Sequence, residues 1–192
     1  CTMTAGRSIL LAAGGTGGHM FPAVSLASAL SARGHSILFV TDPRGGLVTS
    51  DVLGLPKTVM RHTISARSLG GGPKGMAAGV KALAKGFFES RRLIREYKPS
   101  IAVGFGGYPS VPPILAAGFA GLPTVIHEQN AVLGRANRRL ARGAKAFALS
   151  FAQTQRLKSA GHARATVVGN PVRQDIAALA ARPYTPPSGV ID

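Results

Sequence analysis

Short apolar runs alternate along this chain with longer segments whose apolar residues recur at helical spacing. The runs predict buried β-strands at residues 8–13, 36–41, 58–64, 101–103, 124–127, 146–149 and 165–168. The longer segments predict helices at residues 21–33, 75–97, 111–120 and 135–142. Because strands that alternate with helices through short turns form parallel sheets, the pattern predicts an α/β domain with a Rossmann-like, doubly wound parallel sheet.

The first predicted strand runs directly into a glycine-rich turn, and a helical pattern follows it. The turn reads Gly14-Gly15-Thr16-Gly17-Gly18-His19. Glycines let the backbone approach a ligand closely, and free amides at a helix N-terminus attract an anion. The turn is therefore predicted to contact a phosphate or diphosphate. Because no Lys followed by Ser or Thr comes after the last glycine, nucleotide hydrolysis of the P-loop type is not expected.

Two more segments that follow predicted strands carry glycines or polar side chains. Gly106-Gly107-Tyr108 comes after the strand at residues 101–103, and His127-Glu128-Gln129-Asn130 ends the strand at residues 124–127. In open parallel sheets, ligands bind beyond the carboxyl ends of the strands, near the point where the strand order reverses. We therefore expect all three segments to line one crevice.

His19 is the candidate general base of this crevice, because a helix N-terminus disfavours the charged ring and favours the neutral, proton-accepting one. Its alternative role is a hydrogen bond that stabilises the loop. Glu128 is the only acid clearly placed in the crevice, so a carboxylate-held metal site is not expected, although Glu128 is an alternative base. His127 is interpreted as a buried, hydrogen-bonded histidine. Asn130 either contacts a sugar hydroxyl or phosphate or caps the helix that follows.

Charge and composition narrow the classes of partner. The 192 residues include 23 Lys and Arg against seven acids, for a net charge of +16, which predicts nucleic acid, anionic lipid or a phosphorylated substrate as partner. Few tyrosines, no tryptophan and no recognisable reader motif disfavour nucleic acid. The single cysteine, Cys1, excludes a disulfide framework. The uncharged stretch at residues 99–126 is long enough to span a bilayer, but its prolines and glycines favour buried strands and loops.

The predicted helix at residues 75–97 carries an apolar stripe and a basic opposite face. The stripe consists of Met76, Val80, Leu83, Phe87 and Ile94. Over most of its length we expect this helix to pack on the sheet and expose its basic face. The alternative is that its first turns touch a membrane, and the candidate residues for that contact are Met76, Val80, Lys81, Leu83, Lys85, Phe87 and Phe88.

Four motifs, in order along nearly the whole chain, resemble the signatures of the MurG family. They are the glycine-rich turn, Gly106-Gly107-Tyr108, His127-Glu128-Gln129-Asn130 and Gly169-Asn170-Pro171-Val172-Arg173. Members of that family transfer N-acetylglucosamine from UDP-N-acetylglucosamine (UDP-GlcNAc) to undecaprenyl-diphosphoryl-muramoyl-pentapeptide in peptidoglycan synthesis. The resemblance implies an inverting, metal-independent GT-B glycosyltransferase of two Rossmann-like domains, without a cofactor and bound peripherally to the cytoplasmic face of the bacterial inner membrane.

The resemblance also implies roles for individual residues. The acceptor diphosphate would contact Gly14, Gly15, Gly106, Gly107 and Tyr108. UDP-GlcNAc would contact, from this side of the cleft, Thr16, Gly17, Gly18, Asn130 and Arg173. The catalytic candidates are His19 and Glu128, and no residue is expected to hold a metal.

By the same resemblance, this chain corresponds to the acceptor-binding half of such an enzyme and is expected to be inactive alone. Residues 1–7 are expected to form a flexible end, residues 8–172 the acceptor domain, and residues 173–192 a linker toward a donor-binding domain. Two alternatives stay open. A nicotinamide-dependent Rossmann oxidoreductase is favoured by Asp42, which could bind a ribose after the second strand. A basic nucleic-acid-binding module is favoured by the net charge alone.

Overall fold

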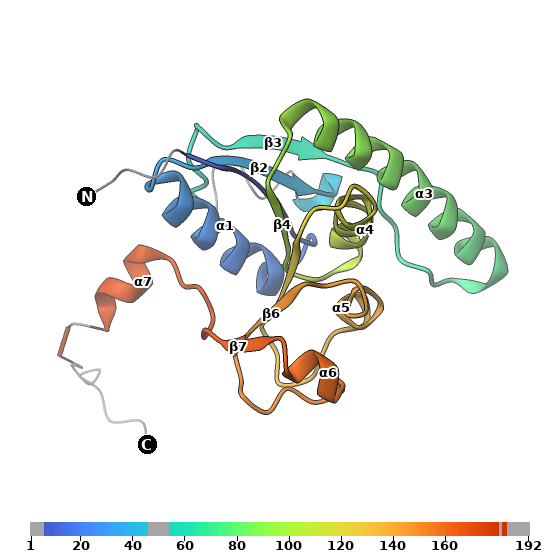
Figure 1. Ribbon diagram of the computed structural model, residues 1–192. Coiled ribbons are helices and arrows are strands. Elements are labelled where there is room, and N and C mark those ends of the chain that lie inside the picture. The colour runs from blue at the N-terminus through green and yellow to red at the C-terminus, as the bar shows by residue number, and fades with distance from the viewer. Residues whose placement is uncertain (1–5, 46–53, 181, 184–192) are drawn as a thin grey trace, which may run out of the picture.

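The computed structural model describes residues 6–45, 54–180 and 182–183 (Figure 1). Its strands are β1 (Ser8–Ala12), β2 (Ser36–Thr41), β3 (Met60–Thr63), β4 (Ile101–Gly104), β5 (Thr124–Glu128), β6 (Ala146–Leu149) and β7 (Ala165–Val167). They form one sheet of order β3-β2-β1-β4-β5-β6-β7, in which every neighbouring pair is parallel. The predicted doubly wound α/β fold is therefore confirmed.

The helices lie on both faces of this sheet (Figure 1). They are α1 (Gly17–Ser31), α3 (Gly72–Tyr97), α4 (Val111–Phe119), α5 (Arg135–Leu140), α6 (Ser159–His162) and α7 (Gln174–Leu179), and a 3₁₀ turn, η1 (Tyr108–Ser110), precedes α4. Neither α6 nor α7 was predicted, and the four residues of α6 are too few to show a helical period. α7 occupies part of the segment expected as a linker. Residues 1–5 of the expected flexible end lie outside the described residues.

The strand order explains where a ligand can bind. The chain builds outward from β1 to β3, returns across the sheet to β4, and then builds outward in the other direction to β7. β1 and β4 are neighbours, so the order reverses between them. The loops at the carboxyl ends of β1, β4 and β5 therefore meet at the switch point, where open parallel sheets bind their ligands.

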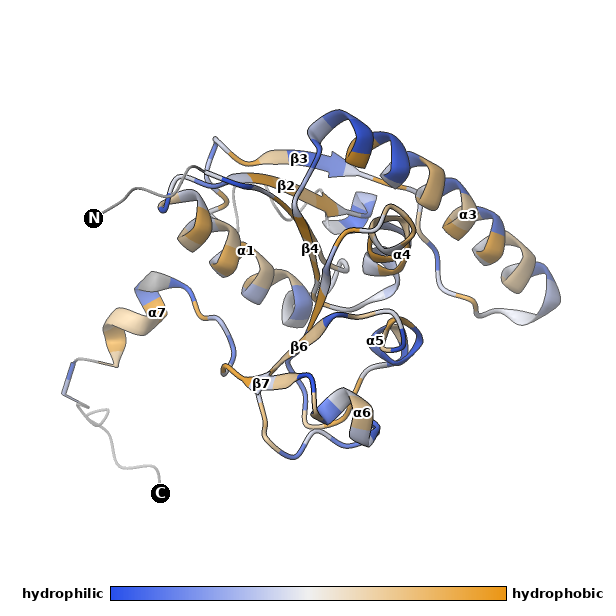
Figure 2. Ribbon diagram, in the orientation of Figure 1, coloured by the Kyte–Doolittle hydropathy of each residue, from blue (hydrophilic) through white to orange (hydrophobic). Residues whose placement is uncertain are grey.

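Two apolar cores, one on each face, hold the sheet in place. Along β1, Ile9 and Leu11 pack into the core that contains Met20 of α1, whereas Leu10 packs on the opposite side with Ile114 of α4. Because both faces are covered, the inner strands are apolar at nearly every position, as Figure 2 shows. Because these strands are buried on both faces, they form apolar runs that could be recognised in the sequence.

α3 departs from the expected packing in its N-terminal half. Leu93 and Ile94, near its C-terminal end, are buried in the core, but Met76 and Val80 are 55% and 56% exposed. The C-terminal half therefore packs as expected, whereas the first turns, for which a membrane contact was the open alternative, are not covered by the sheet. Figure 1 shows why, since the N-terminal half of α3 projects beyond the sheet and α4.

A different face of α3 is buried along that half. Gly79 and Gly86 are buried against the segment that leads into the helix. A Cβ atom on Gly79 would lie 2.7 Å from the carbonyl oxygen of Ser68, and one on Gly86 would overlap the carbonyl of Ser65. Glu89 fixes the same segment by accepting a hydrogen bond from the Ser65 amide at 2.7 Å. Small residues thus decide which face of α3 is covered, and Met76 and Val80 of the apolar stripe face outward.

Among the described residues, no helix is both long enough and apolar enough to cross a membrane. The uncharged stretch at residues 99–126 forms β4, η1, α4 and the start of β5, as expected.

Candidate functional site

The two glycine turns predicted to share a crevice are in direct contact. The Gly14 amide donates a hydrogen bond of 3.1 Å to the carbonyl of Gly106. Gly106 and Gly107 have positive φ angles of 94° and 75°, a backbone conformation that glycine adopts without strain. A Cβ atom on Gly107 would lie 2.9 Å from the Cα atom of Gly14, closer than such atoms can approach. The two glycine turns therefore meet at the switch point of the sheet, as expected from the sequence.

The N-terminus of α1 opens onto this junction without a side chain that neutralises it. Thr16 occupies the N-cap position but makes no side-chain cap bond, and the first turn contains no acid. Gly17 and Gly18 are exposed, and in the described part of the chain their amides donate to no acceptor. Unpaired amides and the positive end of the helix dipole make this point a favourable position for a phosphate.

His19 lies against the second glycine turn. A Cβ atom on Gly106 would lie 3.1 Å from Cε1 of the His19 ring, and one on Gly107 would lie 3.4 Å from Cδ2. The ring is half-buried, and its Nδ1 atom lies 3.1 Å from Oε1 of Gln129. The turn after β1, the turn after β4 and the end of β5 therefore meet at one imidazole.

His127 is a buried histidine with both ring nitrogens occupied, as interpreted from the sequence. Its Nε2 donates to the Gly169 carbonyl at 3.3 Å, and its Nδ1 lies 2.9 Å from Nε2 of Gln129. The ring stacks on Phe105 with 5.2 Å between centroids. Burial lowers the pKa of His127 below its ordinary value, which keeps the ring neutral at physiological pH.

These contacts determine how His19 is protonated. An amide nitrogen can only donate, so Gln129 gives its N–H to His127 and turns its oxygen toward His19. That oxygen can only accept, so Nδ1 of His19 carries a proton. In the neutral ring the other nitrogen, Nε2, is then the proton acceptor. Sequence reasoning assigned no role to Gln129, and the only signal for it was its place within the His-Glu-Gln-Asn motif.

Glu128 does not have the surroundings of a base that contacts substrate. It is 1% exposed, and its carboxylate accepts hydrogen bonds from the Asn130 amide, the Gly134 amide and the Asn137 side chain at 2.8–3.1 Å. These bonds tie the end of β5 to the start of α5. The structure therefore argues against the catalytic role expected for Glu128 and favours a structural one.

Asn130 stands at the mouth of the site. The residue is exposed, and its side-chain nitrogen donates to Glu128 at 2.9 Å. The N-cap of the following helix is Gly134, so the capping role considered for Asn130 is wrong. A contact with a ligand is the alternative that stays as a prediction.

Arg173 reaches the same region from a distant part of the sequence. Its guanidinium carbon lies 5.4 Å from the centroid of the Phe21 ring, in the second turn of α1. The Phe21 ring in turn lies beside Gly17, since a Cβ atom there would be 3.1 Å from it. The fourth motif of the sequence thus meets the first at the N-terminal end of α1.

Asp42 lacks the free carboxylate that would bind a ribose. It is 1% exposed, accepts a hydrogen bond of 3.1 Å from the Gly45 amide and pairs with Arg44 at 2.7 Å. Its Oδ1 atom would lie 2.7 Å from a Cβ atom on Gly15, so the absence of a side chain at Gly15 lets the first turn pack on this carboxylate. The Asp42 carboxylate, which favoured a nicotinamide cofactor in the sequence, therefore already makes local contacts.

Tyr108 borders a hollow of about 450 Å³ beside the second glycine turn. The other residues that line it are Leu69, Arg135, Arg138 and Arg139. The three arginines belong to α5, and no motif predicted that they would lie beside Tyr108. Their position gives the Tyr108 side of the crevice a strongly cationic wall. No group of three or more His, Cys, Asp or Glu side chains that could hold a metal occurs in the described ranges.

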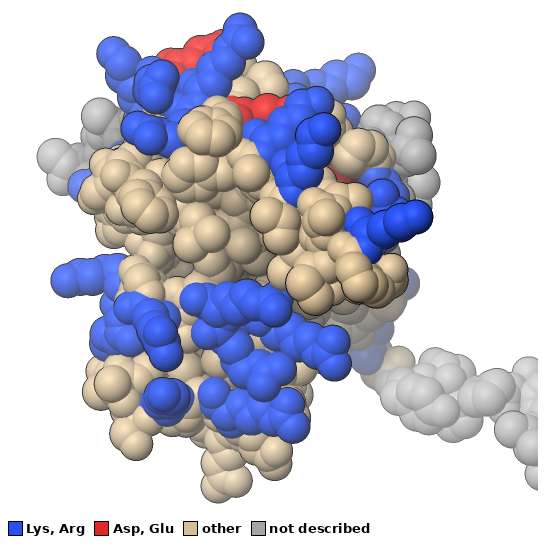
Figure 3. All heavy atoms as spheres, turned by 90° about the vertical axis from the view of Figure 1, so that its right-hand side faces the viewer, with Lys and Arg blue, Asp and Glu red and all other residues tan. Residues whose placement is uncertain are grey.

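An apolar band covers the outer surface of α3 and α4. Phe88 is 67% exposed and Phe119 is 77% exposed. The half-buried Phe87 joins them, with edge-to-face contacts of 5.6 Å to each ring. Figure 3 shows uncharged surface (tan) across the middle of one face of the molecule, with Lys and Arg side chains above and below it. Lys81 and Lys85 are exposed on the same helix.

Comparisons with known proteins agree with the geometry. The model of the glycosyltransferase family 28 N-terminal domain matches residues 9–149. Two relatives, both named UDP-N-acetylglucosamine–N-acetylmuramyl-(pentapeptide) pyrophosphoryl-undecaprenol N-acetylglucosamine transferase, come from Rhodospirillum centenum and Acidiphilium cryptum. They are 49% and 48% identical over 93% and 95% of this chain. The crystal structure of Acinetobacter baumannii MurG superposes with a TM-score of 0.68 and 29% identity over 94% of this chain.

The match covers only part of each relative. The aligned region makes up 46% of the Rhodospirillum centenum protein, 49% of the Acidiphilium cryptum protein and 50% of the Acinetobacter baumannii chain. The chain thus spans about half the length of the relatives that it matches.

Proposed function

Because the chain belongs to glycosyltransferase family 28, we propose that it forms the acceptor-binding half of an N-acetylglucosamine transferase of peptidoglycan synthesis. Its fold is that of the N-terminal domain of a GT-B glycosyltransferase. The donor would be UDP-GlcNAc and the acceptor undecaprenyl-diphosphoryl-muramoyl-pentapeptide. The observation that carries the proposal is the contact between the two glycine turns beneath the uncapped end of α1, with His19 between them.

The acceptor diphosphate binds, in this proposal, where the two turns meet. Gly14 and Gly106 are buried and join the two turns, whereas Gly15 and Gly107 are partly exposed there. A helix N-terminus provides the favourable potential. Tyr108 and the arginines of the adjoining hollow extend the site away from the sheet. Guanidinium groups match phosphate oxygens with paired hydrogen bonds, which makes this wall suited to a diphosphate.

His19 is the base of the reaction. Its Nε2 atom removes the proton from the acceptor sugar hydroxyl as that oxygen forms a bond to the anomeric carbon of the donor. The bond between that carbon and the diphosphate of UDP-GlcNAc breaks, and UDP leaves with the electron pair. Support for this role comes from the hydrogen bond between Gln129 and Nδ1, which leaves Nε2 as the acceptor.

The donor contacts only one wall of its site on this chain. Thr16, Gly17, Gly18, Asn130 and Arg173 are exposed or half-exposed near the start of α1 and the end of β5. Most of the uridine site belongs, in this proposal, to a donor-binding domain joined through residues 173–192, and residues 8–172 form the acceptor domain. The chain alone would then bind acceptor diphosphate but transfer no sugar.

The membrane that carries the acceptor is met by α3, peripherally and at the cytoplasmic face of the inner membrane. The exposed side chains of Met76, Val80 and Phe88, with Leu83 and Phe87 half-buried beside them, form the apolar contact. Lys81 and Lys85 provide the attraction to anionic lipid. This arrangement would bring the diphosphate of a membrane-anchored acceptor toward the crevice without a membrane-spanning helix in the described part of the chain.

A titration panel separates this function from the two alternatives. The purified chain is titrated with a short polyprenyl diphosphate, with NAD and with a random oligonucleotide at physiological salt. We expect saturable binding of the polyprenyl diphosphate and none of NAD. Any oligonucleotide binding should vanish as salt rises, because it would rest on net charge alone. Saturable NAD binding, or oligonucleotide binding that persists at high salt, would contradict the proposal.

A further inference from the structure

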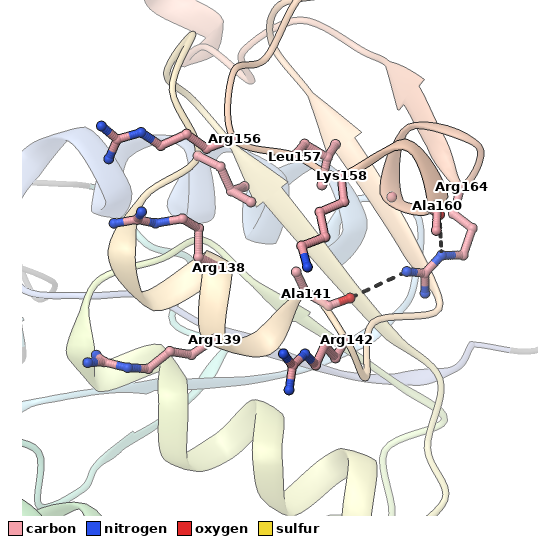
Figure 4. A pocket seen from close by; sticks show the side chains of 11 residues that line it. Arg138, Arg139, Ala141, Arg142, Arg156, Leu157, Lys158, Ala160 and Arg164 are labelled. Atoms are coloured by element: carbon pink, nitrogen blue, oxygen red, sulfur yellow. Dashed lines mark hydrogen bonds between the residues drawn. The ribbon is translucent and has the colours of Figure 1, made fainter.

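A second hollow, larger than the one beside Tyr108, lies between α5 and α6 and has a volume of about 630 Å³. Six cationic side chains line it, namely Arg138, Arg139, Arg142, Arg156, Lys158 and Arg164. Leu133, Leu157 and small residues of both helices supply apolar lining. Figure 4 shows Lys158 extending between the two helices toward Ala141, while Arg138, Arg139 and Arg156 point to one side of the opening.

No acid in the described ranges balances this charge. The ion pairs of that part of the chain join other residues, and none includes a side chain of the hollow. In the lower half of the face shown in Figure 3, no Asp or Glu (red) lies among the Lys and Arg side chains (blue). Like charges held close together repel one another, so an anion between them would be favourable.

Hydrogen bonds fix the backbone segments that carry these cationic side chains. The loop before α6 is tied to the loop before α5, because Gln155 donates to Ala131 at 2.8 Å and Leu133 donates to Gln155 at 3.0 Å. The next residue, Arg156, has a φ angle of 63°, in the left-handed region that L-residues with side chains rarely adopt. Strain of this kind persists where the surrounding contacts fix it, and it is often found at ligand sites.

Arg164 forms the fixed base of the hollow. It donates from Nε to the Ala160 carbonyl at 3.0 Å and from Nη2 to the Ala141 carbonyl at 3.4 Å, and it also donates to Ala144. Its guanidinium lies 5.5 Å from the Phe147 ring centroid. This arginine is used in joining the end of α5 to α6, which leaves the other five cations, all exposed, available for a ligand.

We propose that this hollow binds phosphate groups, as the headgroup of an anionic phospholipid or as a free oligophosphate. Its volume falls in the range of small-molecule sites and allows more than one phosphate. Arginine side chains bind phosphate oxygens in pairs, and the apolar lining fits the glycerol or first methylenes of a lipid. The proposal does not depend on transferase activity, because most residues that line this hollow have no role in the proposed reaction. The exceptions are Arg138 and Arg139, which also line the hollow beside Tyr108.

Calorimetry with inorganic pyrophosphate tests the site on the 192-residue chain. The double variant Arg142→Gln/Lys158→Gln removes two cations of the hollow. The matched control, Arg33→Gln/Lys57→Gln, removes two exposed cations elsewhere, so both variants lose the same net charge. We expect the first variant to bind pyrophosphate at least about tenfold more weakly than the wild type, and the control to stay within about twofold. Equal losses in the two variants, or no binding by the wild type, would overturn the proposal.

A third variant separates this site from the diphosphate site proposed at the glycine turns. Gly107→Ala disturbs the turns but touches no residue of the hollow. We expect it to retain the pyrophosphate affinity that Arg142→Gln/Lys158→Gln loses. If Gly107→Ala abolished all pyrophosphate binding, the hollow would not be a site, whatever the fate of the proposed reaction.

Vesicles identify the source of the phosphate. Binding is measured to vesicles of phosphatidylglycerol and phosphatidylcholine and to vesicles of phosphatidylcholine alone. A lipid headgroup is the ligand if two results are obtained. Arg142→Gln/Lys158→Gln binds the anionic vesicles at least about tenfold more weakly than the charge-matched control, and pyrophosphate displaces the wild-type chain from these vesicles. A free oligophosphate is the ligand if the two variants bind vesicles equally but differ in pyrophosphate affinity.

Discussion

At the scale of single residues, the site depends on a chain of hydrogen bonds from Gly169 through His127 and Gln129 to His19. Each hydrogen bond in this chain has only one possible donor. Because neutral His127 donates from Nε2 to Gly169, its Nδ1 accepts from Gln129, whose oxygen then accepts from Nδ1 of His19. Two motifs of the sequence contain these three side chains, but the atoms that face one another became visible only when the end of β5 was placed beside the start of α1.

The buried histidine predicts a pH dependence of stability. Because burial lowers the pKa of His127 in the folded chain, the unfolded chain binds the proton more readily as the pH falls below about 6.5. This contribution to the free energy of unfolding is complete above that pH and is lost as the pH falls further, by at most about 1.4 kcal/mol per pH unit.

Urea unfolding at pH 7.5 and 5.5 measures this effect. His127→Gln should reduce the loss of stability between the two pH values, whereas the exposed His162→Gln should leave it unchanged. The same loss in wild type and His127→Gln would show that His127 is not kept neutral by burial.

The proposed base predicts a loss of turnover. His19→Ala is made in an enzyme completed by the second half of the Rhodospirillum centenum relative, with His162→Ala as the control. We expect turnover to fall about a hundredfold or more for His19→Ala, because general-base catalysis typically contributes this much, with donor affinity little changed. Turnover within a few-fold of the unsubstituted enzyme would leave His19 a structural role.

At the scale of elements, the buried strands were the most predictable part of the chain. The expected ranges 36–41 and 146–149 coincide with β2 and β6, because strands buried on both faces are apolar throughout. The helical period of α3 identified an apolar stripe, but it did not show which face of the helix would be covered. Gly79 and Gly86 mark the covered face, since small residues permit close approach of a backbone segment.

The outward face of α3 predicts binding to anionic vesicles. Val80→Ser/Phe88→Ser removes two exposed apolar side chains of the band, and Ile176→Ser/Leu179→Ser removes two from α7, which lies on another side of the molecule (Figure 1). We expect the first variant to bind phosphatidylglycerol vesicles at low salt at least about tenfold more weakly, since even one fully buried apolar side chain contributes about 1.5–3 kcal/mol.

The α7 variant should bind these vesicles as the wild type does, and binding by both should weaken with salt. If vesicles containing phosphatidylglycerol retained no more wild-type chain than neutral vesicles, the band would not be a membrane contact.

At the scale of the whole molecule, the sheet brings together what the sequence separates. Gly14, Gly106 and Gln129 come from three different strand ends, and their convergence followed from the general rule for parallel sheets. No such rule predicted the α5–α6 hollow, because Arg142 follows α5 whereas Arg156 and Lys158 precede α6, and the three residues form no motif. Glu128 stands in the middle of a predicted site motif, yet its hydrogen bonds all serve the fold.

The central claim is that the joined glycine turns bind the acceptor diphosphate while the donor site is largely elsewhere. Two alanine variants isolate the junction. Gly107 and Gly121 have positive φ angles of 75° and 74°, which alanine rarely adopts, so both variants carry backbone strain. The ψ angle of 159° at Gly107 adds to this strain, because that region is essentially restricted to glycine. Only at Gly107 would the new methyl group collide with Gly14, because nothing lies within 4 Å of that position at Gly121.

Calorimetry of the 192-residue chain with a short polyprenyl diphosphate and with UDP-GlcNAc is the most direct test. Every chain carries Arg142→Gln/Lys158→Gln, so that the site proposed in the α5–α6 hollow does not contribute. We predict that Gly107→Ala weakens polyprenyl diphosphate binding at least about tenfold, that Gly121→Ala leaves it within about twofold, and that UDP-GlcNAc gives no resolvable heat. Equal polyprenyl diphosphate affinities in the two glycine variants, or tight UDP-GlcNAc binding by the chain with both glycines intact, would contradict the account.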